Sequence, residues 1–147
     1  MNRLIKQKFA EYPDHVREKL GELHALIIDV AGNLELGPVD ESLKWGEASY
    51  SVKSGSPVRI DWKRSSPTQY FIFFNCQTKL VDTFRVVYGK RLVFQKNRAI
   101  ILSISEPIPN VVLSHCIELA FTYKQRRELP LLGVERSRVA TKPNLPS

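Results

Sequence analysis

Cysteine is scarce in this chain of 147 residues, which contains only Cys76 and Cys116. Neither thiol has a second cysteine or a histidine at the spacing of a zinc motif, because His115 adjoins Cys116 and helical neighbours point in different directions. The sequence therefore predicts no metal site built on thiolates. We expect two buried free thiols, as in a protein of a reducing compartment, with a single disulfide as the alternative.

Long hydrophobic runs are also missing from the sequence. No apolar run reaches the roughly 18 residues that a membrane-spanning helix needs, and the longest candidate, 25–31, is interrupted by Asp29. The first fifteen residues include basic side chains but no uninterrupted apolar stretch, so they do not resemble a secretory signal. We therefore expect a cytoplasmic protein that does not enter a membrane.

Recognisable catalytic and cofactor motifs are missing as well. The chain has no glycine-rich phosphate loop, and no two of its three histidines, His15, His24 and His115, have the spacing of metal ligands. No Ser-His-Asp or Cys-His arrangement can be argued from the sequence. The sequence predicts no cofactor and indicates no particular reaction. We therefore expect a non-enzymatic protein, with an enzyme as the alternative.

Hydrophobic residues make up 43% of the chain, which is enough for one sizeable core without disulfides or metals. Val16, Leu20 and Leu23 recur at the spacing of one helical face, whereas Val58 and Ile60 alternate with charged residues as in a half-buried strand. Such patterns predict helices over 13–31, 77–88 and 107–126, and strands over 48–53, 58–63, 70–74, 92–95 and 99–104.

The order of these elements predicts an α+β fold with two layers. We expect a mainly antiparallel sheet of about five strands with three helices, in the order α-β-β-β-α-β-β-α, with the helices on one side of the sheet. The predicted domain is 1–133, with its core at about 13–123. Strand 70–74 is apolar on both faces, so we place it at the centre of the sheet.

The basic charge of the chain is concentrated near its C-terminal end. Six basic and two acidic residues lie between 124 and 147, so this end carries +4 of the net charge of +7. We expect 134–147 to be a basic, weakly ordered tail. A basic tail can bind nucleic acid or another anionic surface, and this is one alternative function.

Several segments in a fixed order resemble one family. They are LKWGEASY (43–50), the strand with Arg59 and Trp62, FNCQTKLVDTF (74–84), NRAI (97–100) and the last helix from 115 to 123. Together they resemble the YdhG-like bacterial domains of unknown function, over roughly 13–123 and without the tail. The resemblance implies a small cytoplasmic bacterial α+β domain and no particular activity.

One branch of the wider family resembles a frataxin-type iron chaperone, so iron binding is a second alternative function. That role needs an acidic surface, because hard cations prefer carboxylate oxygens. The first predicted helix offers four acidic residues with two basic ones among them. These are Asp14, Glu18, Glu22 and Asp29, with Arg17 and Lys19.

Aromatic and cationic residues cluster in and around the predicted strands. The candidate ligand-binding residues are Trp45, Tyr50, Arg59, Trp62, Lys63 and Arg98. An aromatic wall with one or two cations suits a small anionic or planar ligand, so we expect a module that binds a small ligand or a protein partner, with a homodimer as one possibility. The alternative is that Trp45 anchors the sheet, Trp62 fills the core and the charges form a solvated surface.

Overall fold

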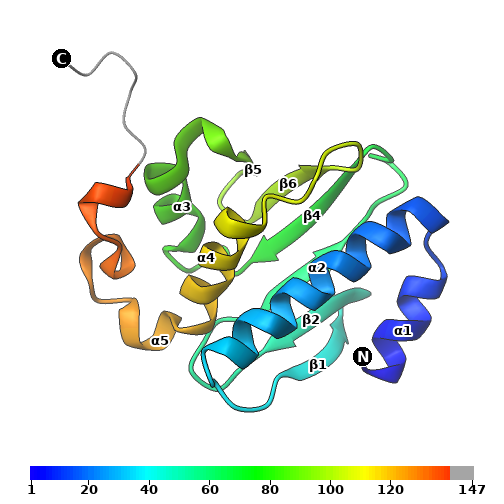
Figure 1. The fold of residues 1–147 in the computed structure, drawn as a ribbon, viewed down its shortest axis with the longest axis horizontal. Coiled ribbons are helices and arrows are strands. Elements are labelled where there is room, and N and C mark those ends of the chain that lie inside the picture. Colours follow the sequence, from blue (N-terminus) through cyan, green and yellow to red (C-terminus); the bar gives the residue numbers. More distant parts are fainter. Residues whose placement is uncertain (140–147) are drawn as a thin grey trace.

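The computed structural model describes residues 1–139 and contains one six-stranded antiparallel sheet, with the helices lying on one of its faces (Figure 1). The strands are β1 (Asp40–Lys44), β2 (Glu47–Ser51), β3 (Val58–Asp61), β4 (Gln69–Phe74), β5 (Val93–Gln95) and β6 (Ala99–Ser103). Their order across the sheet is β1-β2-β3-β4-β6-β5, so β4 is an interior strand, as its apolar sequence predicts.

The helices are α1 (Arg3–Ala10), α2 (Asp14–Asn33), α3 (Leu80–Tyr88), α4 (Asn110–Phe121) and α5 (Tyr123–Arg126), with 3-10 turns η1 (Gly89–Arg91), η2 (Pro130–Gly133) and η3 (Arg136–Arg138). The predicted α+β fold and the single helical layer are confirmed. The counts differ, because α1 and β1 were not predicted and the last predicted helix, 107–126, is divided into α4 and α5. Among the described residues, no helix is long and apolar enough to cross a membrane.

Helix α1 and strand β1 support each other at one edge of the sheet. The Asn2 side chain caps α1 by accepting a hydrogen bond of 2.7 Å from the Leu4 backbone N–H. Asn2 also donates its side-chain amide to the Glu41 carbonyl and its backbone N–H to the Glu41 carboxylate, at 3.2 and 2.7 Å. The start of α1 therefore covers backbone groups that an edge strand would otherwise expose.

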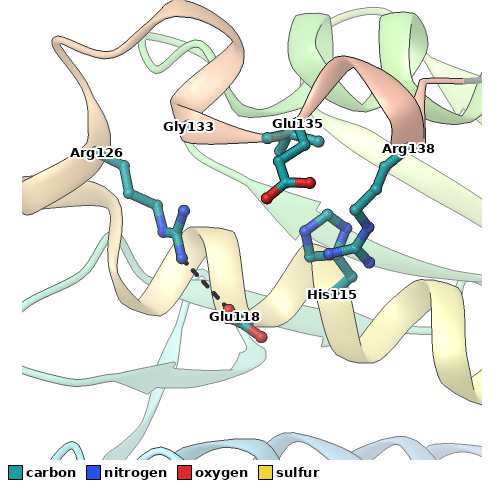
Figure 2. Close-up of a pocket in the computed structure, with 7 residues that line it drawn as sticks. His115, Glu118, Arg126, Gly133, Glu135 and Arg138 are labelled. Carbon is teal, nitrogen blue, oxygen red and sulfur yellow. Dashed lines mark hydrogen bonds and ion pairs between the residues drawn. The ribbon is translucent and has the colours of Figure 1, made fainter.

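The C-terminal segment folds back onto α4 (Figure 2). The Arg126 guanidinium donates to the Thr122 hydroxyl at 2.6 Å and to the Leu132 carbonyl at 3.0 Å, and it forms an ion pair with Glu118 at 3.3 Å. Val134 is buried in the core, so ordered packing extends past the predicted domain end at 133. Of the predicted tail, residues 140–147 lie outside the described part of the chain.

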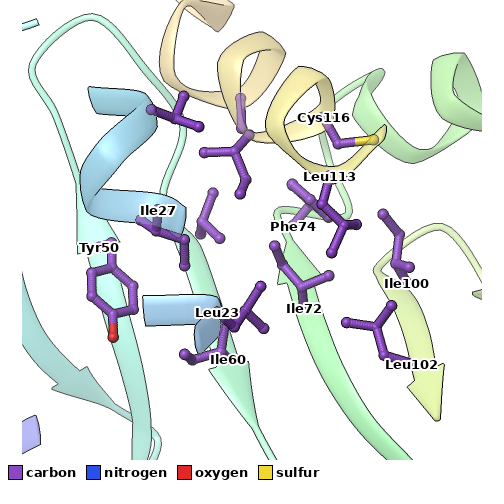
Figure 3. Close-up of a cluster of buried hydrophobic side chains, with 14 of the residues drawn as sticks. Leu23, Ile27, Tyr50, Ile60, Ile72, Phe74, Ile100, Leu102, Leu113 and Cys116 are labelled. Carbon is purple, nitrogen blue, oxygen red and sulfur yellow. The ribbon is translucent and has the colours of Figure 1, made fainter. Parts of the chain in front are cut away.

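The core lies between the sheet and the helices (Figure 3). Side chains of alternate strand residues, including Ile60 and Ile72, meet Leu23 of α2 and Leu113 of α4. Cys116 is buried here, and burial raises the pKa of its thiol. Cys76 is exposed, so the expectation of two buried thiols is wrong for Cys76, although both cysteines are free.

Two of the three histidines are buried against tyrosine hydroxyls. His24 Nδ1 lies 2.6 Å from the Tyr50 hydroxyl, and His115 Nδ1 lies 2.5 Å from the Tyr88 hydroxyl. Burial, with Arg138 and Arg126 nearby, lowers the pKa of His115 to about 4, and burial also lowers the pKa of His24. The folded protein therefore holds both imidazoles in the neutral form near pH 7.

Acidification is expected to destabilise the protein. As the pH falls, the buried histidines take up protons in the unfolded chain at a higher pH than in the folded protein. The contribution of neutral His115 to the free energy of unfolding is fully present above the pKa of about 6.5 that it has in the unfolded chain. This contribution is lost as the pH falls towards its folded pKa of about 4. The His115→Gln variant should therefore lose less melting temperature than the wild type between about pH 7.5 and 4.5. His15→Gln at an exposed position is the control, and equal losses in all three proteins would contradict the assignment.

Candidate functional site

Within residues 1–139, no helix covers the second face of the sheet, here called the outer face (Figure 1). Because strand residues alternate between faces, the cross-strand register places two rows of side chains there. One row contains Val93, Ile101, Phe71 and Asp61, and the other contains Gln95, Ala99, Phe73, Arg59 and Ser49. Phe71, Phe73 and Ala99 form a buried cluster separate from the main core.

The two phenylalanine rings on the outer face are stacked beneath cations. Their centroids are 5.6 Å apart with an interplanar angle of 20°. Lys63 Nζ lies 5.8 Å and the Arg98 guanidinium 5.3 Å from the centroid of the Phe73 ring, which is within the range of a cation–π interaction. Because no helix in the described part of the chain covers the rings, their burial comes from neighbouring side chains such as these.

An ionic network lies beside the rings on β2 and β3. Arg59 Nε bonds one Glu47 carboxylate oxygen at 2.9 Å and Lys63 Nζ bonds the other at 3.0 Å. Lys63 also bonds Asp61 at 3.0 Å, and the Tyr12 hydroxyl donates to the second Asp61 oxygen. The Glu47 side chain is 6% exposed, whereas Arg59 and Lys63 are 26% and 43% exposed. The buried carboxylates therefore hold two accessible cations in place.

The network also sets the protonation of its members. Although burial opposes the charged form of Lys63, the hydrogen bonds and negative charges of Asp61 and Glu47 raise the pKa of its ammonium group. Burial, followed by the hydrogen bond to Asp61, raises the pKa of Tyr12. Arg98 makes no ion pair within residues 1–139, so it adds positive charge that neither carboxylate neutralises.

The six predicted ligand-binding residues fall in three places. Arg59, Lys63 and Arg98 come together on the outer face around Phe73. Tyr50 and Trp62 belong to the core instead, where Tyr50 is fully buried and the Trp62 indole donates to the Pro67 carbonyl at 3.0 Å. They cannot form an aromatic wall beside the three cations.

Trp45 occupies the third place, the tight turn between β1 and β2. Its side chain is 89% exposed, so the prediction that Trp45 anchors the sheet is wrong. Its φ of 57° and the φ of 78° at Gly46 are left-handed values, which suit a two-residue hairpin turn. The turn geometry directs the chain back into β2 and leaves the indole in solvent.

The aromatic residues of the site are ones that the sequence did not single out. Phe71 and Phe73 belong to the run YFIFF, whose alternate residues Tyr70, Ile72 and Phe74 fill the main core. The available signal was the second apolar face of this strand. The apolar second face predicted that these rings would be buried. It did not predict that cationic side chains would cover them instead of helices.

Within residues 1–139, no group of three or more His, Cys, Asp or Glu side chains is arranged to hold a metal ion. Asp14, one of the acidic residues considered for iron, forms an ion pair of 3.0 Å with Arg17. Glu47 and Asp61 are already paired with cations. These observations give no support to iron binding, which stays a prediction from the family resemblance.

Comparisons with protein-family models, with curated proteins and with solved structures gave no match. The resemblance to YdhG-like domains is therefore untested by them, and it too stays a prediction.

Proposed function

We propose that this chain is a non-enzymatic binding module for single-stranded nucleic acid, with the outer face of its sheet as the interface. One observation carries the proposal: the stacked Phe71 and Phe73 rings, with Lys63 at 5.8 Å and Arg98 at 5.3 Å from the Phe73 centroid. Proteins that bind single strands combine cations for the phosphates with aromatic rings or guanidinium planes for the bases.

Each cation has a distinct role in this proposal. Arg98 offers a flat guanidinium above Phe73 on which a base can stack. Arg59 and Lys63, fixed by Glu47, offer positive charge to neighbouring phosphate groups. Phe71 and Phe73 support this layer from below, and bases gain direct contact with the rings where the long cationic side chains move aside.

The shape of the surface and the charge of the chain favour a polyanion over a small ligand. An extended strand can cover the broad surface of a sheet, whereas small molecules are usually held in concave pockets. The net charge of +7 also attracts a polyanion over a distance. We further infer a cytoplasmic location, which the two free cysteines support.

Replacing Arg98 with alanine tests this proposal. Fluorescence anisotropy with a labelled oligothymidine should show low-salt binding by the wild type, and affinity reduced about tenfold in Arg98→Ala, because one stacked base is worth roughly 1–3 kcal/mol. Arg91→Ala is the matched control, since the Arg91 guanidinium lies 5.4 Å from the Tyr88 ring centroid and not over the outer-face rings. It removes the same charge and should preserve most of the affinity.

Three outcomes would contradict the proposal. One is the absence of binding at low salt, and another is an equal loss in Arg98→Ala and Arg91→Ala, which would indicate a non-specific charge effect. Binding of a mononucleotide as tightly as the oligonucleotide would indicate a small-ligand site instead. A chain without residues 140–147, and so without Lys142, should keep its Arg98-dependent binding.

A further inference from the structure

A cavity of about 360 Å³ lies between α4 and the segment from Gly133 to Arg138, away from the outer face (Figure 2). This volume is near the lower end of the roughly 300–1,000 Å³ typical of small-molecule sites. The ionisable side chains in its lining are His115, Glu118, Arg126, Glu135 and Arg138. The cavity therefore contains two carboxylates, two guanidinium groups and one imidazole.

Arg126 and Glu118 already have partners within the protein, and their bonds stabilise the walls of the cavity. The guanidinium nitrogens of Arg126 contact the Thr122 hydroxyl, the Leu132 carbonyl and the Glu118 carboxylate, at 2.6, 3.0 and 3.3 Å. These bonds connect α4 to η2, and the charges of Arg126 and Glu118 offset each other. The remaining charges of the cavity are therefore those of Glu135 and Arg138.

Glu135 and Arg138 do not neutralise each other. Within residues 1–139, neither side chain forms an ion pair. Figure 2 shows the Glu135 carboxylate pointing into the space between Arg126 and His115, with Arg138 beside His115. Because the neutral form of His115 is favoured, Arg138 provides the positive charge at that end. Both side chains are exposed, so a negative and a positive group flank the same small, open cavity on either side of His115.

We propose that this cavity binds a small zwitterion of the α-amino acid class, with its ammonium group on Glu135 and its carboxylate on Arg138. A charged ligand group loses part of its hydration even in an open cavity, and an oppositely charged partner there offsets that loss. A simple anion would leave Glu135 unpaired, and a simple cation would leave Arg138 unpaired. Only a ligand that carries both charges pairs with both residues.

The probes are individual α-amino acids, with acetate and ethylammonium as fragments that carry one charge each. At least one amino acid should raise the melting temperature of the full chain at about 10 mM, and the two fragments should not. By calorimetry, Arg138→Gln and Glu135→Gln should each weaken binding of that amino acid at least about tenfold. Arg136→Gln is the matched control, because Arg136 is exposed in the same 3-10 turn and is absent from the cavity lining.

The melting temperature of each variant without ligand shows whether it is folded, so that weaker binding is not mistaken for unfolding. The proposal is overturned if no amino acid shifts the melting temperature, if acetate binds as tightly as the best amino acid, or if both cavity variants bind like the wild type. These outcomes are independent of oligonucleotide binding by the outer face, because the two sites share no residue.

Discussion

Replacing Gly55 with alanine is expected to lower the free energy of unfolding by about 3 kcal/mol, which corresponds to a fall in melting temperature of roughly 6–12 °C. A Cβ atom at Gly55 would lie 2.5 Å from the Phe121 Cα and 2.6 Å from the Phe121 carbonyl oxygen. Both are backbone atoms, so no rotation of a side chain can relieve the overlap. The turn between β2 and β3 would have to move away from the end of α4.

That movement would also break hydrogen bonds that join the two elements. The Ser56 N–H donates to the Ala120 carbonyl at 2.8 Å, and the Ser54 hydroxyl donates to the Phe121 carbonyl at 2.7 Å. These donors satisfy carbonyl groups at the C-terminal end of α4, which have no partner within the helix. Gly55 is therefore required by the close approach of the turn to α4, and not by an unusual dihedral angle.

Gly21→Ala is the matched control for this prediction. Gly21 lies inside α2, and a Cβ atom there would have no neighbour within 4 Å. The same substitution should raise stability by up to about 1 kcal/mol, because alanine favours a helix more than glycine does. Thermal unfolding followed by circular dichroism would measure both variants. A Gly55→Ala protein that melts with the wild type would show that the turn can move without loss.

The fold class was predictable because the main elements have strong periodic patterns. The apolar stripe of α2 and the alternation in β3 are both confirmed. Helix α1 was missed because it has only eight residues and depends on Asn2 and on contacts with β1. Strand β1 was missed because its sequence, DESLK, is polar, and it is paired with β2 through backbone hydrogen bonds that a side-chain pattern does not report.

The candidate site was only partly predictable. The three cations could be chosen from the sequence, but which face each aromatic residue occupies depends on strand register. Trp62 was a candidate beside Arg59 and Lys63, with a core position as the alternative, and the alternative is confirmed because its indole lies in the core with Tyr12. The amino acid cavity was not predicted, because it is formed by α4 and by residues 133–138, which have no periodic pattern. Only their return onto α4 brings these charges together.

Removing the charge of Glu47 is the second substitution expected to have a large effect. Glu47→Gln should lower the free energy of unfolding by about 2 kcal/mol, because the buried carboxylate is bonded by both Arg59 and Lys63. Breaking a fully buried ion pair costs roughly 3–5 kcal/mol, but both cations here are partly exposed and regain hydration, which reduces the loss. The melting temperature should therefore fall by roughly 4–8 °C.

A double-mutant cycle distinguishes the ion pair from a simple loss of packing. If Glu47 acts through Lys63, then Glu47→Gln combined with Lys63→Gln should destabilise the protein by less than the sum of the single variants. Glu128→Gln at an exposed position is the control and should change stability by no more than about 0.5 kcal/mol. Additive effects of Glu47→Gln and Lys63→Gln would show that the carboxylate does not hold Lys63. The lysine would then be positioned over Phe73 by the aromatic ring and by Asp61 alone.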